Sequence, residues 1–385
     1  MKNSTNFFHL AQLGFIATSG FSMMLILPIV LGGMADQYGF SNIAIGWVAA
    51  TNSLGIALGA LYVPLSGKWF RLQQSIRWSL LGLLLTDITC AFFFTLPPLL
   101  WLRFLAGCFG GVIYAGILRA MAGLPDAGKG FSIYVSVYCA WAALVFFLAP
   151  YVLAWGGVPA LFFYIGLSPL LALIQISILR SFEVKTVGVQ ANTLQYLLRR
   201  KVVLGSLVSY LLLMAGSGAF WAFIERTGNS HGFSVEMIGS ALSISNLAGI
   251  PAGMLAYRLG NRLGVTIPIV VGLFIMALSA FLMGWIPSIW LYGMGAFLFS
   301  GAWAVLIAYF QKVQAKVDFE GKIVALGATI NLMGRALGPA TVGFFLTTDS
   351  FRPVVWYSVV AFAICLVVVW PVLVKIDQHA DTRMI

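Results

Sequence analysis

The stretch GFSNIAIG, residues 39–46, recurs as GFSVEMIG, residues 232–239, in the second half of the 385-residue chain. Five of the eight positions are identical in the two copies. The repeat continues downstream, because Gly55-x-x-x-Gly59 is matched by Gly249-x-x-x-Gly253 at nearly the same offset. We therefore predict that the chain consists of two halves with a shared architecture.

The composition indicates whether these halves lie in water or in lipid. Hydrophobic residues make up 61% of the chain and charged residues 9%, against about 25% charged residues in a soluble domain. The runs 43–65, 80–94, 202–224 and 354–374 contain one charged residue between them, Asp87. Since a spanning helix needs about 20 apolar residues, we predict an all-α membrane protein in a lipid bilayer.

Proline and glycine pairs divide the apolar pattern into twelve transmembrane helices. The expected helices cover residues 8–33, 43–66, 78–96, 98–122, 131–155, 159–179, 201–224, 237–259, 265–285, 288–311, 321–347 and 354–375. The first is read as a retained span and not as a cleaved signal peptide. We expect 1–180 to form an N-terminal six-helix bundle, 181–200 a cytoplasmic linker, and 201–385 a C-terminal six-helix bundle.

The basic residues predict the orientation of the chain. If the N-terminus is cytoplasmic, all but four of the 22 lysines and arginines fall in cytoplasmic loops or ends. The exceptions are Arg226 and Arg352 in outer loops, and Arg103 and Arg335 within spans. We expect both termini in the cytoplasm of a bacterial inner membrane. This topology accounts for the net charge of +11 without nucleic-acid binding.

Residues that carry catalysis or bind metals form no recognisable pattern in the sequence. The four cysteines all lie in expected spans without a C-x-x-C pair, and the three histidines lie at ends or in loops. No phosphate-binding glycine loop or nucleophile–base pair is readable. We expect a monomer with no enzymatic activity, no metal and no cofactor.

Three motifs resemble those of the major facilitator superfamily. GMLAYRLGNRLG, residues 253–264, is similar to the loop signature G-x-L-A-D-R-x-G-x-R, with Tyr257 in place of the aspartate. RFLAGCFGG, residues 103–111, resembles the fourth-helix pattern R-x-x-x-G, and GATINLMGRALGP, residues 327–339, resembles the antiporter pattern. The resemblance implies two six-helix bundles related by pseudo-two-fold symmetry, which rock about a central site to give alternating access.

The resemblance also implies residues that control the conformational change. In the family the loop signature latches one state of the transporter, and here it contains Gly253, Tyr257, Arg258 and Arg262. The alternative is that the two arginines only anchor the loop at the cytoplasmic face. Gly338-Pro339, which pairs with Ala149-Pro150 in the first half, permits a gating bend. The glycines of both G-x-x-x-G pairs favour close helix packing over a hinge.

Charges inside the membrane are costly, so they tend to be functional. Asp87 is expected near the middle of the third helix, and Arg103 lies in the fourth, so an ion pair between them is plausible. That pair is either structural or a protonation site. Glu225 is either a proton site, an outer gate or a solvated helix end. Arg335 has no acid in its own helix, and it either holds an anionic group of the substrate or bonds carbonyls of the Gly-Pro bend.

The resemblance places nine residues beside a central cavity. They are Tyr114, Tyr134, Tyr138, Trp141, Trp221, Asn246, Trp303, Asn331 and Arg335. Such an aromatic pocket with few polar anchors suits an amphiphilic solute. We expect a secondary active transporter for a small organic solute that is amphiphilic and either neutral or anionic, with protons as the leading coupling ion. The alternatives are a hydrophobic-drug efflux antiporter, a non-transporting receptor or scaffold, and a membrane enzyme, which the scattered acids disfavour.

Overall fold

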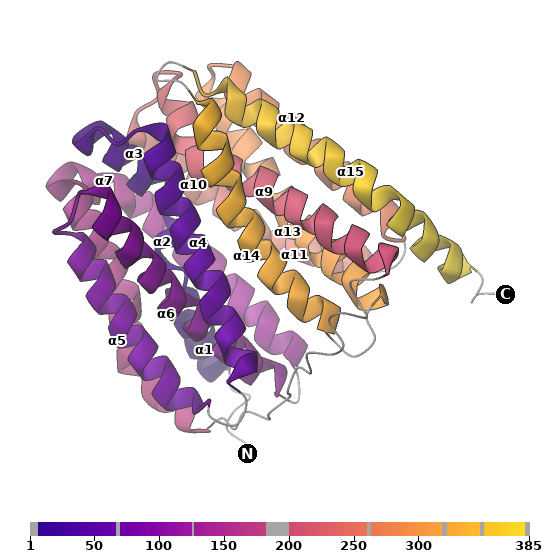
Figure 1. Cartoon of the computed structure of the whole chain (residues 1–385), viewed down its shortest axis with the longest axis horizontal. Coiled ribbons are helices and arrows are strands. Elements are labelled where there is room, and N and C mark those ends of the chain that lie inside the picture. The colour runs from indigo at the N-terminus through magenta and orange to yellow at the C-terminus, as the bar shows by residue number, and fades with distance from the viewer. Residues whose placement is uncertain are drawn as a thin grey trace. The chain divides into compact units, whose positions relative to one another are not determined.

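The computed structural model describes residues 7–66, 70–124, 127–181, 200–259, 263–317, 322–346 and 350–381. The chain divides into two compact units, Met1–Val189 and Gln190–Ile385. Every regular element in the described residues is helical. In Figure 1 the first unit is coloured indigo to magenta and the second rose to yellow.

The first unit contains the six expected spans of the N-terminal half. The first span is made of α1, α2 and α3, and the fifth and sixth are both contained in the long kinked α7. The elements are α1 (Phe7–Ser19), α2 (Ser22–Leu25), α3 (Leu27–Tyr38), α4 (Asn42–Leu65), α5 (Leu72–Cys90), α6 (Leu96–Ala122), α7 (Ala127–Gln175) and the 3₁₀ helix η2 (Ile176–Ser181).

The second unit contains the other six spans. The eighth span is divided into α10 and α11, and the others are single helices. The elements are α9 (Lys201–Asn229), α10 (Val235–Leu247), α11 (Gly249–Leu259), α12 (Thr266–Trp285), α13 (Ile289–Val317), α14 (Lys322–Val342), the 3₁₀ helix η3 (Gly343–Phe345) and α15 (Arg352–Asp381).

The repeated segment, residues 39–46 and 232–239, ends one helix and begins the next. Gly39 and Gly232 have φ of 66° and 81°, a left-handed conformation that favours glycine. Two residues later a serine caps the next helix: Ser41 Oγ accepts from the Ala44 amide at 3.2 Å, and Ser234 Oγ accepts from the Met237 amide at 3.3 Å. The repeat therefore encodes the same corner before α4 and before α10.

The predicted break at Gly156-Gly157 is present inside α7. Gly157 has φ of 67° and ψ of −163°, so the chain leaves the helix there and re-enters it at once. The side chain of Gln37 in α3 closes this corner, because its Oε1 accepts from the Val158 amide at 2.9 Å. One side chain thus satisfies an amide at the start of the sixth span.

Three predicted helices differ from the structure by an interruption or a shift. The helix expected at 8–33 is interrupted at Gly20-Phe21 and at Ile26, two residues before Pro28, which has no amide hydrogen for the preceding turn. The helix expected at 237–259 is interrupted at Ala248, because Pro251 likewise has no amide hydrogen to donate to a carbonyl of the preceding turn. The helix expected at 78–96 spans Leu72–Cys90.

The third difference displaces a predicted site residue. The helix α5 begins at Leu72, in a polar stretch, and Pro97-Pro98, which the sequence predicts as a break between two helices, lie in the first turn of α6. Proline is tolerated there because first-turn amides have no helical partner. Asp87 consequently lies in the last turn of α5 and not near its middle.

Glycines bring α4 and α6 into direct backbone contact. A Cβ on Gly55 would overlap the carbonyl oxygen of Phe104, and one on Gly59 would overlap that of Cys108. From the facing helix, Gly107 and Gly111 meet α4 in the same way. Close backbone approach of this kind drives helix association in lipid, where burial of apolar surface gains little.

Gly253 of the second G-x-x-x-G pair does not act in this way. A Cβ on Gly253 would meet no heavy atom within 4 Å, so the packing expected there from the repeat was wrong. The small residues that approach Gly301 of α13 are Ala248 and Ala252. The interruption of the eighth span at Ala248 is the local difference from α4, which continues unbroken.

This difference gives a matched pair of variants. Gly59→Ala places a methyl group on the Cys108 carbonyl, so we expect a loss of about 1–3 kcal/mol of stability from overpacking. Gly253→Ala, at the equivalent position of the repeat, should leave stability unchanged or slightly increased. Thermal unfolding of both variants in detergent measures the difference. Equal melting temperatures would contradict the proposed contact between α4 and α6.

Candidate functional site

The first charged centre is a buried ion pair in the first unit. Arg103 Nη2 of α6 donates to Asp87 Oδ1 of α5 at 2.6 Å, and both side chains are 0% exposed. The guanidinium carbon of Arg103 lies 5.1 Å from the centroid of the Phe162 ring. The pair that the sequence made plausible is therefore a direct, fully enclosed contact next to an aromatic face.

This ion pair is only partly satisfied by its surroundings. Asp87 Oδ2 and Arg103 Nε and Nη1 have no hydrogen-bond partner in the described part of the chain, and neither does Ser22 Oγ. Ser22 lies beside the Asp87 carboxylate and begins α2, where the first span is interrupted. Buried polar groups normally have partners, so this centre has spare capacity for water or for a transferred proton.

The second charged centre surrounds Arg335 of α14. Its guanidinium carbon lies 4.8 Å from the centroid of the Trp303 ring of α13, and both residues are half-buried. Arg335 makes no hydrogen bond or ion pair with any described residue. One turn away, Asn331 Nδ2 donates to the hydroxyl of Tyr210 at 2.8 Å. Four residue types of one site are thus brought together from three helices.

Close packing fixes the position of Arg335. The neighbouring Gly334 and Gly338 would both overlap α9 if they carried a Cβ, Gly334 at Met214 and Gly338 at the Ala215 carbonyl. From the other side, a Cβ on Gly218 of α9 would lie 2.9 Å from Arg335 Cα. The backbone of α14 is held against α9 at Gly334 and Gly338. The Cα atom of Arg335, from which the guanidinium side chain projects, is therefore fixed in position.

Three of the four predicted aromatic residues of the first unit, the tyrosines, form a continuous row. Ring centroids of Tyr114 and Tyr134 lie 6.3 Å apart, as do those of Tyr134 and Tyr138. Tyr114 also contacts Phe21 edge-to-face at 4.5 Å. Trp141 contacts Phe15 at 5.0 Å, and its Nε1 donates to Ser168 Oγ at 3.0 Å. The four predicted residues are half-buried, with their rings arranged along α6 and α7.

Three other predicted residues of the second unit are Glu225, Trp221 and Asn246. Glu225 is 1% exposed, so it is not a solvated helix end. The hydroxyl of Tyr292 donates to the adjacent Ile224 carbonyl at 2.8 Å. Trp221 is half-buried. Asn246 Nδ2 donates to Leu242 of its own helix at 2.8 Å.

The predicted gating residues are partly visible. Arg258 and Gly253 are exposed on α11, whereas Arg262 and the side chain of Tyr257 lie outside the described residues. Pro339 is buried, and α14 continues through it to Val342 before the 3₁₀ helix η3. The described residues contain no cluster of His, Cys, Asp and Glu that could hold a metal ion.

Comparison with known proteins assigns the family. The sequence profile of the Major Facilitator Superfamily matches residues 13–312 and 206–383. The chain belongs to this superfamily. An uncharacterized MFS-type transporter of Bacillus subtilis (strain 168), YceJ, is 21% identical over 364 residues, which are 91% of this chain and 92% of that protein.

Solved structures of a transporter have the same fold. The crystal structure of the nucleoside transporter NupG has a TM-score of 0.72 at 14% identity, and it covers 95% of this chain and 98% of its own. A single-residue mutant of NupG has a TM-score of 0.74 at 17% identity, covering 94% of this chain and 100% of its own. The all-helical membrane fold predicted from the sequence is thereby confirmed.

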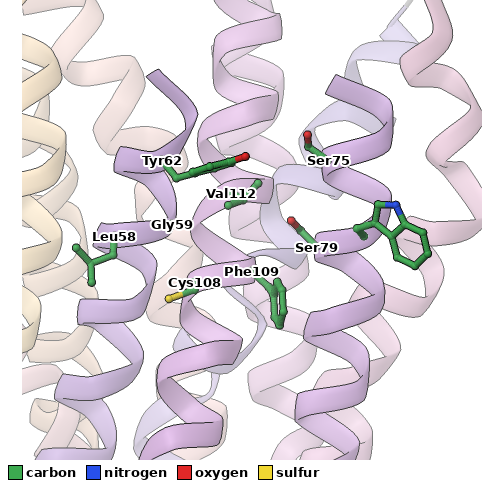
Figure 2. A pocket seen from close by; sticks show the side chains of 9 residues that line it. Leu58, Gly59, Tyr62, Ser75, Ser79, Cys108, Phe109 and Val112 are labelled. Carbon is green, nitrogen blue, oxygen red and sulfur yellow. The ribbon is translucent and has the colours of Figure 1, made fainter. Parts of the chain in front are cut away.

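Two features of this superfamily member had no signal in the sequence. Gln314 of α13 is fully buried, and neither atom of its amide has a hydrogen-bond partner in the described chain. In the sequence Gln314 lies between Lys312 and Lys316, a pattern typical of a solvated helix end. The second feature is a cavity of about 400 Å³ beside α4, α5 and α6. Figure 2 shows side chains from all three helices around it.

The buried ion pair predicts a characteristic stability pattern. Arg103→Met leaves the Asp87 carboxylate buried and unpaired, so it should destabilise the first unit by about 3–5 kcal/mol. Asp87→Leu should also destabilise by leaving Arg103 without its partner. The double variant should recover most of this loss, since two apolar side chains need no partners. Denaturation in mixed micelles measures the cycle, and additive losses would show that the two residues do not interact.

Proposed function

We propose that the chain is a secondary active transporter of a small, amphiphilic, anionic organic solute, working by alternating access across the bacterial inner membrane and coupled to protons. Membership of a transporter superfamily supports the general class. The observation that carries the substrate class is Arg335, a half-buried cation over an indole ring without a counter-charge among the described residues.

Arg335 offers an anion two kinds of interaction. Its planar guanidinium can donate two parallel hydrogen bonds to a carboxylate or phosphate. The Trp303 ring against which it lies supplies an apolar surface for the body of the solute. A charge within a membrane span is costly when unpaired, and an anionic solute would offset that cost each time it binds. Asn331 adds an amide one turn away.

Proton coupling is proposed for the Asp87–Arg103 pair, with Glu225 as a second titratable group. Protonation of Asp87 would abolish the charge that Arg103 pairs with and leave the guanidinium to find other partners. The pair adjoins the interruption of the first span at α2, so a change in its hydrogen bonds would act on an irregular backbone segment. Gly338-Pro339 and the loop residues Gly253, Tyr257, Arg258 and Arg262 are proposed to take part in the conformational change.

A second candidate function is efflux of uncharged or hydrophobic compounds. The row of Tyr114, Tyr134 and Tyr138 favours it, because these rings offer apolar faces with few charges. A nucleoside, the substrate class named for NupG, is one neutral amphiphile of this kind, although identity of 14–17% carries the fold alone. A non-transporting receptor would bind its solute without moving it.

Transport by purified protein in liposomes tests the proposal. A panel of aromatic carboxylates, their neutral amides, matched cations and uridine is supplied with and without an imposed pH gradient. We expect saturable, gradient-driven transport of a carboxylate. Arg335→Gln should raise its KM about tenfold to a hundredfold, the loss of a charged hydrogen bond, while Arg335→Lys should be intermediate because it loses only the bidentate geometry.

Arg352 provides the matched control. It also lies over a tryptophan, 5.2 Å from the Trp285 ring, but it begins α15 and is exposed. Arg352→Gln should therefore leave anion transport unchanged. Equal transport of the carboxylate by wild type and Arg335→Gln would refute the anionic substrate, and transport of neutral compounds alone would favour efflux. Binding without any flux would favour the receptor.

A further inference from the structure

The cavity of the first unit is a groove between two helices that share a third. α4 and α5 both pack along α6 and make few contacts with each other. Between them lies a cavity of about 400 Å³. Figure 2 shows Leu58 and Tyr62 on one side, Ser75 and Ser79 on the other, and Cys108, Phe109 and Val112 of α6 between them.

The groove opens sideways from the first unit. Its rim residues are well exposed: Leu58 46%, Tyr62 51% and Trp78 64%. Its floor is formed by smaller or more enclosed residues, since Gly59 is held on the Cys108 backbone and Ser79 is 6% exposed. The helices α4 and α6 are apolar and long enough to cross a membrane. An exposed opening between two such helices would face lipid, and hydrocarbon would then be its natural filling.

One end of the groove carries two arginines. Arg71 is the residue that precedes the first turn of α5, in an extended conformation, four positions before Ser75 in the sequence. Arg71 is exposed, and it makes no ion pair with a described residue. On the floor helix, Arg119 lies two turns beyond Val112, and its Nη1 donates to the Val63 carbonyl of α4 at 3.2 Å. The positive-inside pattern assigns this end to the cytoplasmic leaflet.

We infer that this groove binds one acyl chain of an anionic phospholipid from the cytoplasmic leaflet, with the phosphate held at Arg71 and Arg119. Charge complementarity selects this occupant. The apolar groove matches an acyl chain, and the two guanidinium groups beyond its end match the phosphate of the same lipid. The Ser75 and Ser79 hydroxyls lie between the two regions, where the ester groups of a lipid would be. A helix from a second copy of this chain would fill the groove but would not neutralise the charge of Arg71.

Native mass spectrometry of the full chain tests this site. Protein freed of lipid is titrated with phosphatidylglycerol and, separately, phosphatidylethanolamine of the same chain length. We expect one phosphatidylglycerol to bind more tightly than phosphatidylethanolamine. Arg71→Gln should weaken phosphatidylglycerol binding about fivefold, which corresponds to about 1 kcal/mol for one basic residue, and should leave phosphatidylethanolamine binding unchanged.

Arg77→Gln is the matched control, because Arg77 is an equally exposed arginine of α5 that does not line the groove. It should bind both lipids as the wild type does. Ser75→Trp, which fills the groove, should reduce binding of phosphatidylglycerol and abolish cross-linking of a diazirine-labelled acyl chain to α6 near Phe109. Equal effects of Arg71→Gln and Arg77→Gln, cross-links elsewhere, or a dimer that Ser75→Trp dissociates would each overturn the inference.

Discussion

Direct backbone contact between helices at glycine is the constraint on which the rest of each unit depends. In lipid, two apolar helices gain little by burying side chains against each other, so van der Waals contact must hold them. Gly55 and Gly59 provide it between α4 and α6, and Gly334 and Gly338 provide it between α14 and α9. These contacts leave no room for relative sliding within a pair, so each unit is expected to move as a body.

The charged centres depend on these contacts. Arg103 projects from α6, the helix that α4 grips, and Arg335 lies between the two glycines that meet α9. The two arginines differ in what surrounds them, because one is enclosed with a carboxylate and the other lies half-buried on an indole ring. One fixed helix in each unit thus carries a cation, paired in α6 and unpaired in α14, which suits the two tasks that we propose for them, proton coupling and solute binding.

The class, the spans and the repeat were readable from the sequence because the bilayer imposes length and polarity on every helix. The repeated Gly-Phe-Ser corner and the break at Gly156-Gly157 needed only local conformation. The contacts were less readable. Gly59 and Gly253 occupy equivalent positions of the repeat. A Cβ added at Gly59 would overlap a carbonyl, whereas one added at Gly253 would meet no atom within 4 Å. That difference depends on the facing helix and on Pro251, and the early start of α5, the groove and the burial of Gln314 depend likewise on tertiary packing.

Distances between spin labels measured by pulsed electron resonance test most directly whether the two units move as bodies. In a cysteine-free background, labels at the exposed positions 92 and 155 report on the first unit, and labels at 290 and 352 report on the second. A pair at 92 and 290 reports between units. On acidification, or on addition of a transported solute, the account predicts unchanged distributions within each unit and a redistribution between them. Changes within a unit as large as those between units would contradict it.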